Sequence, residues 1–129
     1  MKKIKYYIFA FVIGILLFSC TNVDDNLFVI KVDSLNHPTS IAVNDTITFK
    51  LFGIIGNNGC YSFSHFDDQI EPLVVDLTVW GNLPTSGGCP DMIVYLNKEY
   101  KIATTQKGTF FIRIHQPDDS ILIDSVSVE

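Results

Sequence analysis

The sequence predicts an all-β domain, an antiparallel β-sandwich of about seven to eight strands. Short runs of alternating apolar and polar residues recur along the chain, and turn formers separate them at intervals of about 8–12 residues. No run has the apolar spacing of an amphipathic helix. Alternation with period two indicates strands that bury one face and expose the other.

The clearest strands lie at 46–51, 73–80 and 108–115. The residues expected to face the interior are Ile47, Phe49, Leu51, Leu73, Val75, Leu77, Val79, Phe110, Ile112 and Ile114.

Less regular runs at 27–32, 40–43 and 60–66 are also predicted to be strands. The runs 93–96 and 100–104 flank Asn97, Lys98 and Glu99, which favours a hairpin. In 121–128 the apolar residues change from odd to even positions near Asp124 and Ser125, which indicates a bulge.

A leader precedes this domain. Three lysines stand before an apolar run from Tyr6 to Phe18, about thirteen residues, which suits a signal peptide. A membrane span needs about 20 residues.

The end of this run resembles a bacterial lipobox, with Leu17, Phe18 and Ser19 before Cys20. The resemblance implies that Cys20 receives diacylglycerol and becomes the new N-terminus. Cleavage by the ordinary signal peptidase, with a free Cys20, and an uncleaved anchor are the alternatives. We therefore divide the chain into a lipoprotein signal peptide (1–19), a polar tether (20–26) and a β-sandwich domain (27–129).

Asp24 and Asp25 follow the lipid site closely. Such pairs resemble the surface-export signals of Bacteroidetes-type lipoproteins, which implies a lipid anchor in the outer membrane and exposure at the cell surface. A solvated linker is the alternative interpretation.

Charge narrows the range of partners. Removing Lys2, Lys3 and Lys5 with the leader leaves six Lys and Arg against 14 Asp and Glu, a net charge of −8. Phosphate binding relies on Lys and Arg, so nucleic acid is not an expected partner. The expected partners are the membrane, through the N-terminal lipid, and a protein or glycan.

If Cys20 is lipidated, Cys60 and Cys89 are the two remaining cysteines in an oxidising compartment, where a disulfide is the default. Closing a loop of about 30 residues contributes roughly 3.6 kcal/mol in the chain-entropy model. A nucleophilic thiol and a metal ligand are the alternatives, but neither cysteine has a second one at CxxC spacing.

Gly108, Thr109 and Phe110 open a strand that leads into a final hairpin. This entry resembles the closing strands of immunoglobulin-like and fibronectin type III-like modules in bacterial surface proteins, which implies an immunoglobulin-like sandwich. Antibody domains carry a core tryptophan between their cysteines, whereas Trp80 is expected to face outward. A small barrel is the alternative fold.

Catalytic signatures are sparse. His65 with Asp67 and Asp68, and His115 with Asp118 and Asp119, lie at strand-to-turn junctions, where Asp is favoured for turn formation. Neither set has the spacing of a zinc site, and Ser86 does not lie in a nucleophile elbow. We expect no metal, no cofactor and no enzymatic activity. His37 precedes a proline in a turn and is expected to be solvated.

Binding is the remaining class of function. Four aromatic residues lie at positions of the predicted strands that face away from the core: Trp80, Phe52, Phe66 and Phe111. Exposed aromatic residues that are grouped in space mark surfaces for a partner or a sugar. The alternative is that both faces of some strands are covered, or that the register differs by one. We expect a binding or adhesion module for protein or glycan, and a structural subunit of an envelope complex is the second hypothesis.

The lipid site gives the first testable prediction. Cys20→Ala removes the acceptor thiol, so the variant is expected to lose acylation and to leave the detergent phase. Phase partitioning and mass spectrometry of the purified protein measure this. A variant that stays acylated and detergent-bound like the parent contradicts the prediction.

Overall fold

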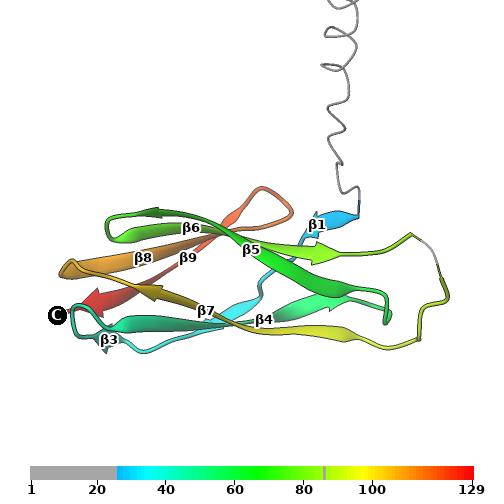
Figure 1. Cartoon of the computed structure of the whole chain (residues 1–129), viewed down its shortest axis with the longest axis horizontal. Helices are drawn as coiled ribbons and strands as arrows, with labels where there is room; N and C mark the ends of the chain where they lie inside the picture. The colour runs from blue at the N-terminus through cyan, green and yellow to red at the C-terminus, as the bar shows by residue number, and fades with distance from the viewer. Residues whose placement is uncertain (1–25, 86) are drawn as a thin grey trace, which may run out of the picture.

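The computed structural model describes residues 26–85 and 87–129 and shows two β-sheets, an arrangement consistent with a β-sandwich (Figure 1). The all-β prediction is therefore confirmed. The described residues form nine strands, compared with the seven or eight predicted: β1 (Leu27–Val29), β2 (Ser34–Asn36), β3 (Ser40–Ile41), β4 (Thr46–Gly56), β5 (Ser62–Glu71), β6 (Val74–Asn82), β7 (Val94–Ala103), β8 (Gly108–His115) and β9 (Ile121–Val128).

The predicted leader and Cys20 lie outside the described residues. Within the described ranges, no helix has the length and apolarity needed to cross a bilayer.

The larger sheet, sheet A, is built around β6. Strand β5 pairs with one edge of β6, while β8 and β1 share the other edge, and β9 and β3 follow β8. The smaller sheet, sheet B, has the order β2-β4-β7.

Two strand pairs, β6 with β8 and β3 with β9, are parallel, so the prediction of an entirely antiparallel sandwich was wrong. The chain leaves β6 for β7 in sheet B and returns as β8, and such a crossover permits parallel pairing.

The core lies between the sheets and follows the predicted alternation. Val75, Leu77 and Val79 of β6 are fully buried, as are the predicted inward residues of β4 and β8. Phe49 of β4 and Phe110 of β8 meet across the sheets, with ring centroids 6.5 Å apart. Burying each large apolar side chain contributes about 1.5–3 kcal/mol.

The predicted hairpin at 93–104 was wrong, because β7 runs through it unbroken. Asn97, Lys98 and Glu99 pair with successive residues of β4. The Glu99 carboxylate lies 3.9 Å from the Lys50 ammonium and 3.7 Å from that of Lys101, so neighbouring charges on the solvent face support a polar stretch within a strand.

The predicted bulge in the last strand was also wrong. The pairing of β8 with β9 is continuous from Gly108 with Val128 to His115 with Ile121. As a result Ile121 and Ile123 point away from the core and are 45% and 57% exposed. Register shifts occur instead in β4, between Ile54 and Gly56, and in β5, between Phe63 and His65.

The disulfide prediction agrees with the structure. Cys60 and Cys89 are bonded with a Cα–Cα distance of 5.2 Å, and they join the loop after β4 to the loop before β7.

Side chains of β5 and β7 close one side of the two-sheet structure. The Tyr100 hydroxyl of β7 donates to the Asp68 carboxylate of β5 at 2.6 Å, and the Phe66 ring packs edge-on against Tyr100. The Lys98 ammonium lies 5.1 Å from the centre of the Phe63 ring. Burial, followed by the hydrogen bond to Asp68, raises the pKa of Tyr100, so its hydroxyl keeps its proton at physiological pH.

Adjacent phenylalanines on β8 test this packing. Phe110 is 2% exposed and Phe111 is 41% exposed. Phe110→Ala is expected to reduce the free energy of unfolding by about 3–5 kcal/mol, because it leaves a cavity between the sheets. Phe111→Ala is the matched control, with an expected loss of at most about 1 kcal/mol. Urea unfolding measures both, and equal losses would contradict the strand orientation.

Candidate functional site

The four aromatic residues selected from the sequence do not form one surface. Trp80 on β6 and Phe111 on β8 lie on the outer face of sheet A, and Phe52 lies on the outer face of sheet B. Phe111 is level with Val74, six residues from Trp80 along β6. This separation is about 20 Å at 3.3 Å per residue.

Phe66 was wrongly predicted to face outward. The register shift between Phe63 and His65 places an extra residue in β5. Each later side chain of β5 therefore faces the opposite side of the sheet from the one predicted. Phe63 and Phe66 therefore both pack against the core, with ring centroids 5.0 Å apart, while His65 faces outward.

The same shift aligns polar side chains across the outer face of sheet A. Because residues directly opposite each other in a sheet have neighbouring side chains, β5, β6 and β8 together form continuous rows. The cross-strand pairs are His65 with Trp80, Asp67 with Thr78, Gln69 with Asp76, Asp76 with Arg113 and Thr78 with His115.

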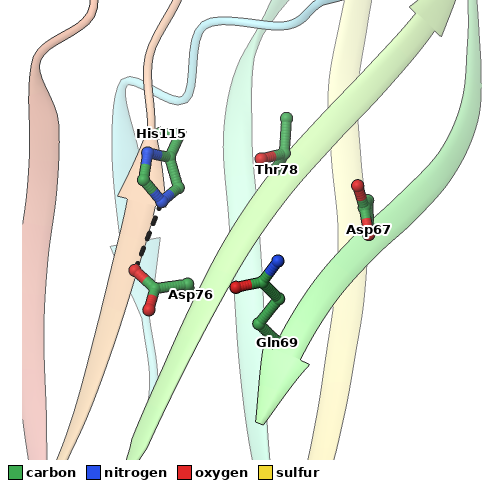
Figure 2. A pocket seen from close by; sticks show the side chains of 5 residues that line it. All are labelled: Asp67, Gln69, Asp76, Thr78 and His115. Atoms are coloured by element: carbon green, nitrogen blue, oxygen red, sulfur yellow. Dashed lines mark hydrogen bonds and ion pairs between the residues drawn. The ribbon is translucent and has the colours of Figure 1, made fainter.

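Five of these residues line a pocket of about 320 Å³: Asp67, Gln69, Asp76, Thr78 and His115. Figure 2 shows His115 and Asp76 pointing toward each other from neighbouring strands, whereas Gln69 and Asp67 extend from β5. Among the five residues drawn, only His115 and Asp76 are joined by a dashed line. The pocket thus combines one fixed pair with a carboxylate, an amide and a hydroxyl available for a ligand.

Asp76 is the electrostatic centre of this face. Its carboxylate accepts a hydrogen bond from Arg113 Nη2 at 2.5 Å and lies 3.2 Å from His115 Nε2. The hydrogen bond from Arg113, with a smaller contribution from His115, holds the pKa of Asp76 below its usual range although burial opposes this. Asp76 is therefore charged and paired at neutral pH, so its charge is locally balanced.

At the end of the face toward β1, His65 stacks on Trp80. The ring centroids are 6.3 Å apart and the planes differ by 18°. Trp80 is half-buried and His65 is exposed. The two rings form a stacked aromatic pair next to the polar rows.

The histidine and aspartate groups considered as metal ligands are not brought together as ligand sets. Asp67 faces outward opposite Thr78, while Asp68 faces the interior and accepts a hydrogen bond from Tyr100. Across residues 26–85 and 87–129, no group of three or more His, Cys, Asp or Glu residues is placed to hold a metal ion.

Sequence reasoning missed Asp76, Thr78 and Gln69 as site residues. The alternation along β6 already placed Asp76 and Thr78 beside Trp80 on the outer face. The neighbouring strands were the missing information, because the partners Arg113 and His115 come from a crossover strand.

A second pair of titratable groups lies at the margin of the core. His37, expected to be solvated, is only 12% exposed, and its Nε2 lies 3.0 Å from Oδ2 of Asp124. Its Nδ1 lies 2.9 Å from the Pro38 carbonyl, and its ring packs 5.3 Å from Phe49. Both ring nitrogens thus face acceptors, an arrangement that suits the doubly protonated ring.

Burial lowers the pKa of His37, but the Pro38 carbonyl and Asp124 together outweigh it and raise the pKa above 6.5. The pKa of Asp124 is lowered, chiefly by its hydrogen bond with His37. The contribution of His37 to stability is complete below its unfolded pKa and is lost as the pH rises through the folded pKa. That of Asp124 is present above its unfolded pKa and is lost as the pH falls through the folded pKa.

The pair is therefore expected to stabilise the fold most in the mildly acidic range, about pH 5–6. His37→Gln should lower the urea midpoint most in this range, and its difference from the parent should shrink as the pH rises through neutrality. Asp124→Asn should show the same narrowing. A difference that does not change between pH 5 and 8 contradicts this prediction.

Comparison with known proteins gave no match to a family model, a curated protein or a solved structure.

Proposed function

We propose that this protein is a lipid-anchored envelope lipoprotein, positioned at the outer membrane, whose β domain binds an uncharged glycan on the outer face of sheet A. The observation that carries the proposal is the stacked pair of Trp80 and His65 beside a polar pocket on one face. An indole offers a flat apolar surface with one N–H donor, which suits the face of a sugar ring.

The pocket supplies the groups that a polyol requires. Asp67 and Gln69 provide acceptors and an amide donor, and Thr78 provides a hydroxyl that acts as donor and acceptor. The net charge of −8 after removal of the leader disfavours an acidic glycan. The side chains therefore suit a neutral oligosaccharide, with binding and no chemical step.

An immunoglobulin-like assignment is part of the proposal. The two-sheet architecture supports it. The parallel pairing of β6 with β8 departs from the antiparallel sheets of immunoglobulin domains.

A structural subunit of an envelope complex is the second candidate. Ile121, Ile123 and Phe111 are exposed on the outer face of sheet A, where a neighbouring subunit can cover them. The mass in solution separates the two candidates, because a stable oligomer at micromolar concentration favours the subunit and a monomer favours the binding module.

Trp80→Ala tests the glycan site. The variant is expected to lose about two- to tenfold in affinity for a neutral oligosaccharide identified from a panel, because an aromatic contact contributes about 0.5–1.5 kcal/mol. Half-burial limits the expected loss of stability to about 1–2 kcal/mol.

Isothermal titration measures the affinity and urea unfolding measures the stability. Phe111→Ala, on the same face but outside the pocket, is the matched control and should bind like the parent. If no neutral oligosaccharide binds the parent, or if Trp80→Ala binds as tightly, the glycan site is wrong.

A further inference from the structure

Exposed apolar side chains gather at the end of the domain where the described chain begins. In the described part of the chain, eight large hydrophobic residues are exposed, and four of them belong to the end of β4, the start of β7 and the segment before it. We call them the entry-end patch: Ile54, Met92, Ile93 and Tyr95, with exposed fractions of 52%, 53%, 49% and 66%. Ile54 and Tyr95 are paired directly across the two strands.

Charge is nearly absent from the segments that build this end. Residues 53–66 contain no Asp, Glu, Lys or Arg, and residues 79–97 contain only Asp91. Asp33, which borders the hollow beside Ile54 and Tyr95, is paired with Lys31 at 3.4 Å. Apart from Asp24 and Asp25 in the tether, most of the acidic residues thus lie elsewhere, so this end can approach a zwitterionic lipid surface with few charges to desolvate.

The first described residues are fixed to the same end. The Asn26 carbonyl accepts a hydrogen bond from the Leu83 amide at 3.0 Å, and the Phe28 ring lies directly over Gly81. A Cβ at Gly81 would lie 2.4 Å from Phe28 Cζ, so only glycine leaves room for the ring. In Figure 1, β1 lies at the end where β6 enters its loop and β7 begins, opposite the C-terminus.

The tether length limits how far this end can be from a membrane. Only residues 21–25 separate Cys20 from Asn26, and six Cα–Cα steps span at most about 20 Å when extended. Packed sheets are about 10 Å apart, so the ends of both sheets lie within reach of the anchoring bilayer.

We infer that the entry-end patch docks on the lipid surface that holds the anchor, an inference that rests on the proposed lipidation of Cys20. Tyrosine and aliphatic side chains suit the boundary between headgroups and acyl chains. A short tether keeps the patch at high effective concentration near the bilayer, so a weak interaction is sufficient.

The test uses the lipidated mature protein in phosphatidylcholine vesicles. An environment-sensitive fluorophore is attached to a cysteine introduced by Met92→Cys, and the control label is attached by Thr105→Cys, at an exposed position between β7 and β8. The emission at position 92 is expected to shift to shorter wavelength and to become less quenched by aqueous iodide on reconstitution. The emission at position 105 should not change.

A second comparison assigns the effect to the patch. Ile54→Ser in the Met92→Cys protein should reverse part of the shift, whereas Ile70→Ser, which changes a residue that is 61% exposed on β5, should not. Urea unfolding confirms that both variants are folded.

The outcomes separate the two proposals. If the protein is acylated and bound to vesicles but position 92 stays as quenchable as position 105, docking is wrong and the anchor stands. If the protein is not acylated, the anchor fails and the inference fails with it. If position 92 is protected without vesicles and the solution mass doubles, a second copy covers the patch, which also overturns docking on lipid.

Discussion

The contact between the inner faces of the two sheets is the constraint on which the rest of this structure depends. Phe49 and Phe110 meet across the interior, and the alternation along β4, β6 and β8 follows from placing every second side chain there. Once this parity is set, the other positions must face solvent. Trp80, Asp76 and Thr78 are thus held side by side on a rigid sheet face, which is a better platform for a ligand than a loop.

Alternation predicted the core because the period of a strand is a local property. It predicted less about pairing, since β6 lies beside β8 only through a crossover that no spacing in the sequence shows. The polar residues Asn97, Lys98 and Glu99 signal a turn locally, yet their positions on an edge strand of a two-sheet structure make them compatible with β7. Tertiary pairing overrides local turn preference there.

The candidate site was predicted only in part for a similar reason. One extra residue between Phe63 and His65 moves Phe66 into the core and His65 onto the outer face, where it stacks on Trp80. A bulge has no reliable sequence signature here, because Ser64 fits either face. The aromatic surface therefore depends on a backbone irregularity, and bulges are commonly found where a strand must redirect a side chain.

The two proposed surfaces are compatible in one orientation. If the entry end faces the bilayer, the strands point away from it, and the outer face of sheet A stands roughly upright. Trp80 pairs with Val29 of β1, so in this orientation it is the residue of the glycan site that lies closer to the membrane than Asp76. Asp76 precedes it by four residues on β6 and lies about 13 Å further from the membrane. A glycan chain lying along this face would then run between the lipid surface and the outer end of the domain, and the acidic residues kept away from the entry end would stay in solvent.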